Sequence, residues 1–382
     1  MDLETFTWLL TDEGQALLEE AARTNDPEGR QLRAQYAGDQ VAAALTQVDL
    51  RERARVKFGD LAQRMYFTTD GLEQATRLSV SQHRAARISA SGLETIIDLG
   101  CGIGGDLIAF ASAGLTAAGV DLDPLRVAIA EANLAAAGVG GATMVADATT
   151  LNLSPFGIAF ADPARRTGRG RTFQVDAWQP SWDFVETLLA RDAVVKTAPG
   201  IDHALIPEGV EAEWVSDGGE VKEAALWAGR LASVRRRATV IGASGLATIT
   251  DEDENNEEVV NLGRYLYEPD GAVIRAGLVG AVAAGVGGGL IDPRIAYVTS
   301  DSSFRTPFAR SYVINEEVPF REKQLRAALR VRGIGRLTIK KRGIAITPEE
   351  LRKRLELKGD NEATLVLTRV RNQGTALLVT PF

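Results

Sequence analysis

The segment from Asp98 to Asp106, DLGCGIGGD, constrains the fold of this chain more than any other feature of the sequence. The apolar run Thr95-Ile96-Ile97 before it is typical of a strand, and a helix is expected after it. Gly100, Gly102 and Gly104 let the backbone pass close to a ligand, because glycine carries no Cβ. The segment therefore predicts a strand, a turn and a helix around a nucleotide-like ligand.

The segment from Glu94 to about Gly242 alternates short β-branched runs with alanine- and leucine-rich stretches. Such alternation is typical of a parallel sheet with crossover helices, and the helical spacing of apolar residues after Pro124 predicts one of these helices. The expected strands end at Asp98, Asp121, Asp147, Asp162 and Lys196. We therefore predict an α/β fold with a Rossmann-like sheet.

The pattern changes along the chain and divides it into regions. Residues 1–75 are expected to be helical, residues 76–243 to form the α/β domain, and residues 316–382 to form a small α+β domain. Residues 244–315 connect these domains, and we assign them no role. Their acidic run, residues 251–258, is expected to be a solvated loop because its charges repel one another.

Charge is segregated along the chain. From Pro319 to Phe382 there are 15 Lys and Arg residues against 6 Asp and Glu, whereas the rest of the chain has 28 against 45. The net charge of −8 argues against nucleic-acid binding through the whole surface. The basic end, with clusters at 332–336 and 340–343, is nevertheless suited to contact a polyanion.

The composition argues against several other classes of protein. One cysteine, Cys101, excludes an intrachain disulfide framework, and with only His83 and His203 a Cys- or His-built metal site is not expected. The acidic start of the chain does not resemble a secretory signal, and the longest uncharged apolar stretch, 276–291, is too short to cross a membrane. We therefore expect a cytoplasmic protein that holds no metal.

The glycine segment has two interpretations. Gly100, Gly102 and Gly105, with Asp121 further on, also fit the spacing of a dinucleotide site and hence an oxidoreductase. Asp98 favours a different ligand, since a carboxylate there attracts an ammonium group and repels a pyrophosphate. S-adenosylmethionine carries such an ammonium group, and we predict it as the cofactor.

The later strand ends fit the same cofactor. Asp121 is placed to accept from the ribose hydroxyls, and Asp147 to accept from the adenine amino group. The predicted cofactor-binding residues are Asp98, Gly100, Gly102, Asp121 and Asp147. The alternative is that each aspartate caps the helix or turn that follows it.

The predicted reaction centre is Asp162-Pro163, after the apolar run 158–161. A carboxylate beside a proline-fixed backbone carbonyl offers two acceptors to one exocyclic amine, and the carboxylate can help to remove its proton. An ordinary Asp-Pro turn is the alternative. Arg165 and Arg166, the first of a run of arginines, are predicted to bind substrate phosphate; the alternative is a solvated loop paired with acids.

From residue 57 to 242 the sequence resembles class I S-adenosylmethionine-dependent methyltransferases, and it is similar to the trimethylguanosine synthase family. The shared residues are Lys57, Ala62-Gln63-Arg64, Phe67, Asp70-Gly71, Ser79-Val80, DLGCGIGGD and VDLDP at 120–124. That family has two prolines and a base-stacking tryptophan in its catalytic motif. Here Asp162-Pro163 is followed by Ala164 and Arg165, which argues against activity on a cap guanosine. We hypothesise that the Arg165 guanidinium plane replaces the aromatic ring as a stacking surface.

Asp162–Arg166, Tyr267–Asp270 and the basic end occur together in this chain. In these segments the whole chain resembles bacterial methyltransferases with a THUMP-like C-terminal domain. THUMP domains bind RNA, so this resemblance implies an RNA substrate. It also implies a Rossmann-like class I methyltransferase fold and the cofactor and catalytic roles given above. We predict methyl transfer to an exocyclic base amine in RNA. The alternatives are a small-molecule or protein methyltransferase and a non-catalytic RNA-binding protein with a cofactor pocket.

Overall fold

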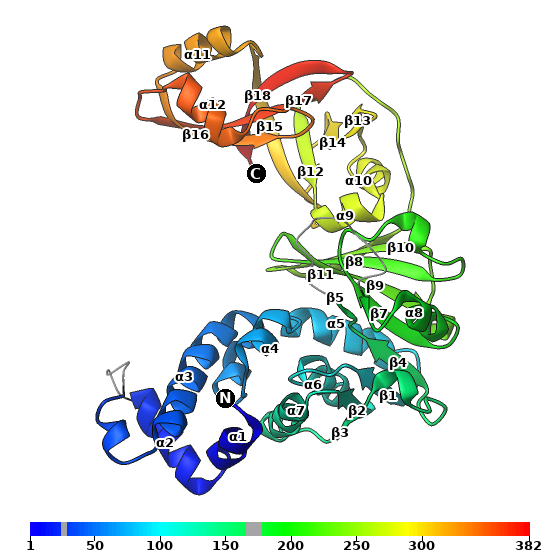
Figure 1. The fold of residues 1–382 in the computed structure, drawn as a ribbon. Coiled ribbons are helices and arrows are strands. Elements are labelled where there is room, and N and C mark those ends of the chain that lie inside the picture. Colours follow the sequence, from blue (N-terminus) through cyan, green and yellow to red (C-terminus); the bar gives the residue numbers. More distant parts are fainter. Residues whose placement is uncertain (24–28, 166–177) are drawn as a thin grey trace. The chain divides into compact units, whose positions relative to one another are not determined.

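The structure is a computed structural model that describes residues 1–23, 29–165 and 178–382. It divides into two compact units (Figure 1). The first unit comprises Met1–Thr197, Ile201–Val210 and Ala225–Ser233. The second unit comprises Ala198–Gly200, Glu211–Ala224 and Val234–Phe382.

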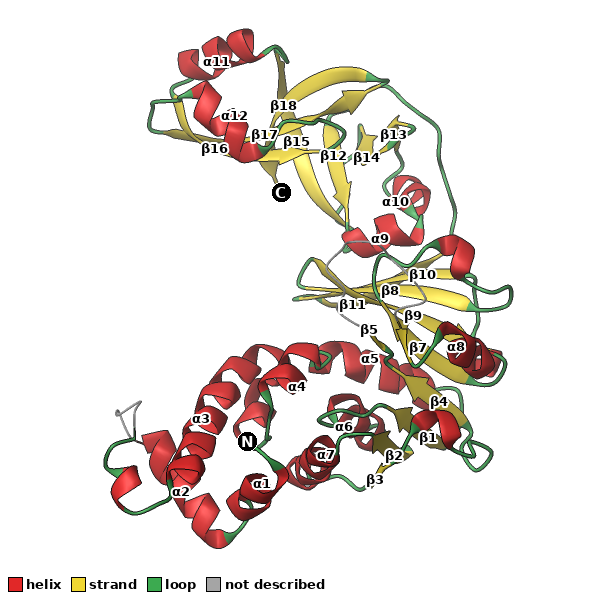
Figure 2. Ribbon diagram, viewed as in Figure 1, coloured by secondary structure: helices red, strands yellow, loops and turns green. Residues whose placement is uncertain are grey.

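The first unit combines a helical N-terminal region with an α/β region (Figure 2). Its helices are α1 (Leu3–Leu9), α2 (Asp12–Arg23), α3 (Gly38–Phe58), α4 (Thr69–Gln74), α5 (Leu78–Ser89), α6 (Gly105–Ser112), α7 (Pro124–Ala137) and α8 (Trp182–Leu189). Its strands are β1 (Thr95–Leu99), β2 (Thr116–Asp121), β3 (Ala142–Val145), β4 (Ile158–Ala161), β5 (Ala164–Arg165), β6 (Trp178–Gln179) and β7 (Ala193–Thr197).

The α/β region contains a parallel sheet with strand order β7-β4-β1-β2-β3. Each of the polar residues predicted to end a strand lies within two residues of the end of β1, β2, β3, β4 or β7. Parallel strands bring their carboxyl ends to one edge of a sheet, so these residues gather at that edge. The predicted α/β class and the Rossmann-like sheet are confirmed.

Helix α7 shows how the sequence sets the local structure. The Asp123 side chain accepts from the Leu125 backbone N–H and caps the helix, and Pro124 occupies its first turn. The helix ends where Gly138 adopts a left-handed conformation, with φ of 72°. Ile129 and Leu134 are among its buried residues, as expected for a crossover helix against a sheet.

The N-terminal helices share one hydrophobic core with the α/β region. Phe6 of α1, Leu17 of α2 and Phe58 of α3 are buried in the same cluster as Ile96 of β1 and Phe160 of β4. Burying such side chains contributes roughly 1.5–3 kcal/mol each. Within the first unit, the helical region and the α/β region therefore form one core.

The second unit is mostly sheet. Its strands are β8 (Glu211–Asp217), β10 (Arg236–Gly242), β11 (Gly245–Thr250), β12 (Tyr265–Pro269), β13 (Gly289–Asp292), β14 (Ile295–Ser300), β15 (Ala309–Val318), β16 (Ile334–Lys341), β17 (Asn361–Val370) and β18 (Gln373–Pro381). Its helices are α9 (Gly271–Ala276), α10 (Val279–Gly285), α11 (Glu322–Val331) and α12 (Pro348–Leu355). Strand β9 (Glu220–Ala228) crosses the boundary between the units.

A seven-stranded sheet in the order β13-β14-β12-β15-β18-β17-β16 forms most of this unit. The small α+β module predicted for the basic end is present as α11, β16, α12, β17 and β18. Thr347 and Glu350 form a capping box at the start of α12. Residues 244–315, to which the sequence assigned no role, supply β12, β13, β14 and most of β15 of the same sheet.

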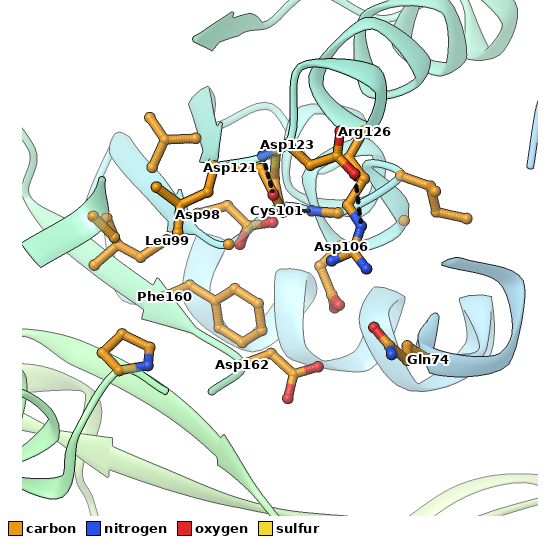
Figure 3. A pocket seen from close by; sticks show the side chains of 18 of the residues that line it. Gln74, Asp98, Leu99, Cys101, Asp106, Asp121, Asp123, Arg126, Phe160 and Asp162 are labelled. Atoms are coloured by element: carbon orange, nitrogen blue, oxygen red, sulfur yellow. Dashed lines mark hydrogen bonds and ion pairs between the residues drawn. The ribbon is translucent and has the colours of Figure 1, made fainter. Parts of the chain in front are cut away.

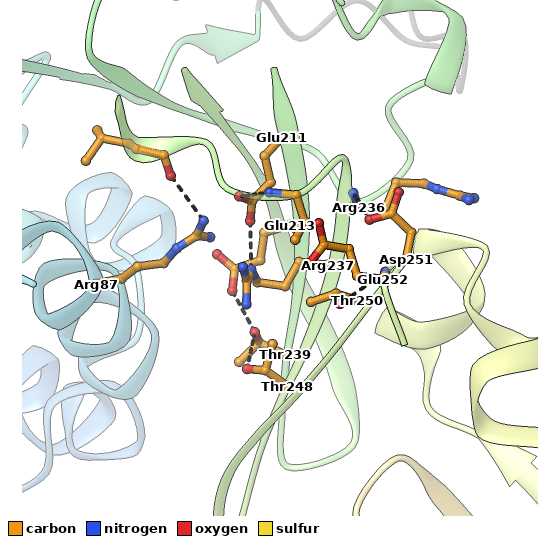
Figure 4. A network of polar contacts seen from close by, with 12 residues as sticks. Arg87, Glu211, Glu213, Arg236, Arg237, Thr239, Thr248, Thr250, Asp251 and Glu252 are labelled. Atoms are coloured by element: carbon orange, nitrogen blue, oxygen red, sulfur yellow. Dashed lines mark hydrogen bonds and ion pairs between the residues drawn. The ribbon is translucent and has the colours of Figure 1, made fainter. Parts of the chain in front are cut away.

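Strands β8, β10 and β11 carry a network of buried polar side chains (Figure 4). Glu211 accepts from the Arg237 Nε at 2.7 Å, and Glu213 accepts from the Thr239 hydroxyl at 2.6 Å. Thr239 also contacts Thr248 Oγ1 at 3.1 Å. Buried carboxylates need such partners to offset lost hydration, so the network helps to fix the pairing of these strands.

Candidate active site

A cavity of about 750 Å³ lies in the first unit, at the carboxyl ends of β1, β2 and β4 (Figure 3). Its volume falls within the range of small-molecule and cofactor sites. The residues predicted from sequence that line it are Asp98, Gly100, Gly102, Asp121, Asp147 and Asp162. The structure thus brings together residues up to 64 positions apart in the chain, from Asp98 to Asp162.

The glycine turn has a backbone that other residues rarely adopt. Gly100 and Gly102 have φ of 104° and 54°, and a Cβ on either would meet no atom within 4 Å. The backbone therefore borders open space, which a ligand can approach closely. Asp121 supports the turn, since its Oδ2 accepts from the Gly102 N–H at 3.0 Å and its Oδ1 from the Asp123 N–H at 3.0 Å.

Asp98 is the most unusual group in the cavity. Its residue is 2% exposed, and its Oδ1 has no hydrogen-bond partner in the part of the chain that the structure describes. Burial raises the pKa of Asp98 well above its ordinary value, the nearby charges of Asp106 and Asp162 raise it further, and Arg84 opposes the shift. A cation in the cavity would supply the missing partner.

These features fit S-adenosylmethionine. An unpaired buried carboxylate suits an ammonium group, and the open glycine backbone leaves room for the chain that joins it to the nucleoside. Each oxygen of the Asp121 carboxylate has a second lone pair, so it retains acceptor capacity for a ribose hydroxyl. A pyrophosphate would instead lie against the Asp98 and Asp162 carboxylates.

Asp147 follows β3 and has a local partner. Its Oδ1 accepts from the Thr149 N–H at 2.9 Å and from the Thr149 hydroxyl at 2.7 Å, which caps the short 3-10 helix Ala148–Thr150. These hydrogen bonds lower the pKa of Asp147. The capping alternative is therefore realised at this residue, although Asp147 also lines the cavity.

Asp162 follows β4 directly and lines the cavity, with its side chain 35% exposed. Its Oδ2 accepts from the Lys196 ammonium group at the end of β7. Pro163 is buried directly after it. The Arg165 backbone pairs with Trp178 across β5 and β6, and Arg166 lies outside the described residues.

One wall of the cavity comes from the N-terminal region, which sequence reasoning did not assign to the site. Gly71, Gln74, Ala75 and Thr76 line it. Lys57 holds this wall, because its Nζ donates to the backbone carbonyls of residues 72, 73 and 75, each at 2.8 Å. The sequence signal for this wall is the motif that contains Lys57 and Asp70-Gly71.

A buried amide joins the same region to the glycine turn. Asn133 of α7 accepts from the Tyr66 N–H at 2.7 Å and donates to the Ile103 carbonyl at 2.8 Å. The segment before α4 and the turn after β1 are therefore fixed to one helix. This rigidity keeps both walls of the cavity in place.

The described residues hold neither a metal-binding cluster nor a membrane-spanning helix. Within 1–23, 29–165 and 178–382, no group of three or more His, Cys, Asp and Glu side chains is arranged to hold a metal ion. Over the same residues, no helix is long and apolar enough to cross a membrane.

Comparison with known families agrees with the geometry of the site. Residues 96–162 match the family model of methyltransferase domains, and residues 309–381 match that of THUMP domain-like regions. Residues 2–54 match a domain of unknown function. The fold and the cavity define a class I methyltransferase that uses S-adenosylmethionine.

Similar proteins identify the family. The chain is 36% identical over 354 residues to uncharacterised S-adenosylmethionine-dependent methyltransferases from two strains of Mycobacterium tuberculosis. The match covers 89% of this chain and 95% of each relative. The protein therefore belongs to this family of S-adenosylmethionine-dependent methyltransferases with a THUMP-like C-terminal region.

A crystal structure of a methyltransferase candidate from Porphyromonas gingivalis has the same fold. It is 22% identical to this chain, with a TM-score of 0.77. The superposition covers 97% of this chain and 98% of the other. The N-terminal helices, the α/β region and the sheet of the second unit thus occur together in a second protein.

Proposed function

We propose that this methyltransferase acts on an exocyclic amine of a base in RNA. The THUMP-like region and the excess of basic residues near the C-terminus support an RNA substrate, because phosphate contacts by Lys and Arg dominate nucleic-acid affinity. When bound, S-adenosylmethionine supplies an electrophilic methyl group. The protein's task is then to hold donor and acceptor in line and to accept a proton.

The proposed cofactor contacts follow from the cavity. Asp98 binds the ammonium group through its unpartnered Oδ1, and the turn at Gly100 and Gly102 passes beside the amino-acid portion. The Asp121 carboxylate accepts a hydrogen bond from a ribose hydroxyl. Asp147 receives the adenine amino group through Oδ2, since its Oδ1 is engaged by Thr149.

The observation that carries the proposal is the place of Asp162. Its carboxylate lines the same cavity as the glycine turn, and among the described residues its hydrogen bond is the one from Lys196 to Oδ2. Oδ1 is then available to accept a hydrogen bond from one N–H of the target amine. The backbone carbonyl that Pro163 fixes accepts from the second N–H. Two acceptors orient the nitrogen lone pair toward the methyl group, and the carboxylate helps to remove the proton.

The RNA is proposed to be held by charge. Arg165 and Arg166 follow the catalytic pair in sequence and are suited to bind phosphate. The basic side chains after Pro319 are proposed to bind the rest of the strand. We also propose that the enzyme works in the cytoplasm, on the RNA present there.

The proposal is tested by comparing modified nucleosides, by mass spectrometry, from cells with and without the gene. We expect a base methylated on an exocyclic nitrogen to disappear from one RNA class. Purified enzyme should restore it with S-adenosylmethionine. Methyl acceptance that survives nuclease treatment of an extract would instead favour a small-molecule or protein acceptor, and cofactor binding without any product would favour a non-catalytic RNA-binding protein.

A further inference from the structure

A lysine at the end of a neighbouring strand faces the proposed catalytic carboxylate. Strands β4 and β7 are parallel, with Ala161 paired to Val195, so Asp162 and Lys196 follow at the same level of the sheet. The Lys196 ammonium donates to Asp162 Oδ2. The lysine side chain is 15% exposed, so the pair is partly shielded from water.

The same ammonium group has a second partner that fixes its direction. Lys196 Nζ donates to the Thr76 hydroxyl at 3.1 Å, and that hydroxyl donates to Asp106 Oδ2 at 2.9 Å. Thr76 belongs to the N-terminal wall of the cavity. Lys196 is thus held from two sides, and its contact with Asp162 does not depend on a freely rotating side chain.

The chain of contacts ends in a buried ion pair. Asp106 of α6 pairs with Arg84 of α5, whose side chain is 1% exposed. The Arg84 guanidinium lies 4.8 Å from the centre of the Phe160 ring, two residues before Asp162. Positive and negative groups therefore alternate from Arg84 through Asp106 and Lys196 to Asp162, with Thr76 as the neutral link.

This alternation matters because the cavity contains several acids. Asp98, Asp106 and Asp162 all line it, and like charges so close repel one another. Arg84 offsets Asp106, and Lys196 offsets Asp162. Asp98 has no basic side chain bonded to it in the described part of the chain, so the ammonium group of the cofactor can pair with its carboxylate.

We propose that Lys196 is a positioning residue for methyl transfer: it fixes the Asp162 carboxylate with Oδ1 toward the acceptor and offsets its charge, and Thr76 anchors it to the Arg84–Asp106 pair. This inference rests on the proposed function, in which Asp162 receives the target amine. Without the charge of Lys196, the Asp162 carboxylate would bind a positively charged group at the methyl position of the cofactor too strongly.

The first test measures binding without any methyl acceptor. Sinefungin carries an ammonium group where S-adenosylmethionine carries its sulfonium methyl group, and S-adenosylhomocysteine carries neither. The ratio of their dissociation constants, from calorimetry at pH 8, reports the charge facing the methyl position. We expect Lys196→Met to raise the preference for sinefungin at least fivefold and Asp162→Asn to lower it at least fivefold.

Matched variants separate positioning from general damage. Lys196→Arg keeps the charge and should leave the preference within twofold of the wild type. Lys340→Met removes a lysine of another ion pair, in the second unit, and should change neither dissociation constant. A Lys196→Met variant that weakens both ligands equally, or leaves their ratio unchanged, would overturn the proposal.

The second test uses turnover. With the acceptor identified, Lys196→Met should lower kcat at least tenfold and leave the dissociation constant of S-adenosylhomocysteine within threefold, and Lys196→Arg should recover part of kcat. Loss of kcat in both variants would identify Lys196 as a proton acceptor, since arginine stays protonated. A wild-type enzyme inactive on RNA would contradict the proposed substrate, whereas the sinefungin ratio would still decide the role of Lys196.

Discussion

The first and second units each hold a lysine against a carboxylate, and the two pairs have different surroundings. In the first unit, Lys196 meets Asp162 at the wall of a cavity. In the second unit, Lys340 of β16 donates to Glu268 Oε2 of β12 at 2.6 Å. The Tyr312 hydroxyl donates to the same oxygen at 3.2 Å, and the Lys340 ammonium lies 5.6 Å from the Tyr312 ring centre.

The Lys340–Glu268 pair, called the enclosed pair below, is a structural contact. The Lys340 and Glu268 side chains are 21% and 19% exposed. Burial lowers the pKa of Lys340, but the hydrogen bonds to Glu268 and Tyr312 outweigh it and raise the pKa overall. Burial also raises the pKa of Tyr312. The Lys340–Glu268 pair, with Tyr312 beside it, thus stabilises a sheet. The Lys196–Asp162 pair consists of the same kinds of side chain but lies at a cavity, where it forms a candidate reaction centre.

The largest expected effect is on kcat, and it distinguishes Asp162 from Glu268. Asp162→Asn should lower kcat by roughly 10²–10⁴-fold, the usual contribution of a positioned acid or base. The affinity for S-adenosylhomocysteine should change only a few-fold, because that molecule lacks the transferred methyl group. The measurement is single-turnover methyl transfer with calorimetry as the binding assay. Glu268→Gln is the matched control, and an equal loss of kcat there would remove the distinction between the pairs.

A smaller effect is expected at Asp98, whose Oδ1 has no hydrogen-bond partner among the residues that the structure describes. Asp98→Asn should weaken S-adenosylmethionine binding by about 10–100-fold, because it removes a charge-assisted contact. The same change should raise the free energy of unfolding of the ligand-free protein by roughly 1–2 kcal/mol, since a buried carboxylate no longer loses its hydration. Chemical denaturation with and without cofactor measures both. A destabilised ligand-free variant would contradict this account of Asp98.

The pH dependence of cofactor binding provides a further difference between the units. The raised pKa of Asp98 means that the ligand-free protein holds a proton there at lower pH, and a bound ammonium favours the carboxylate. Binding should therefore release a proton, and affinity should rise with pH by up to about 10-fold per unit below that pKa. Calorimetry in buffers of different ionisation enthalpy measures the release, which Asp98→Asn should abolish.

The smallest effect is expected at the enclosed pair. Lys340→Met should lower the free energy of unfolding by roughly 1–2 kcal/mol, because Glu268 loses a charged donor. Because the pKa of Lys340 is raised on folding, its contribution should be complete below its ordinary pKa of 10.5 and decline as pH rises above it. Thermal unfolding across this pH range measures it. Methyl transfer that falls while stability stays unchanged would point to a functional role for Lys340 instead.

The sequence indicated where the strands of the parallel sheet end. Asp98, Asp121, Asp147 and Asp162 lie where short apolar runs end, and a sheet of parallel strands brings such ends together. The glycine turn was recognisable because its backbone conformation excludes most other residues. These signals depend on neighbouring residues and therefore appear in a single sequence.

Contacts between distant residues were not predictable in the same way. Thr76 and Lys196 are 120 positions apart, and nothing in either segment indicates that one will contact the other. Strand β12 pairs with β14 and β15, so the region from 265 to 318 acquires a clear architecture only when its strands meet. Pairing of this kind depends on the tertiary structure, which local patterns do not encode.

The wall formed by residues 71–76 has a consequence for how the enzyme is made. A ribosome synthesises this wall early, yet the lysine that bonds to Thr76 comes 120 residues later. Domains generally fold as units during synthesis, so the nascent chain completes its binding site only after β7 has emerged. Until then the early segment has its contacts with Lys57, Asp106 and Asn133, and the Thr76 hydroxyl lacks its lysine donor.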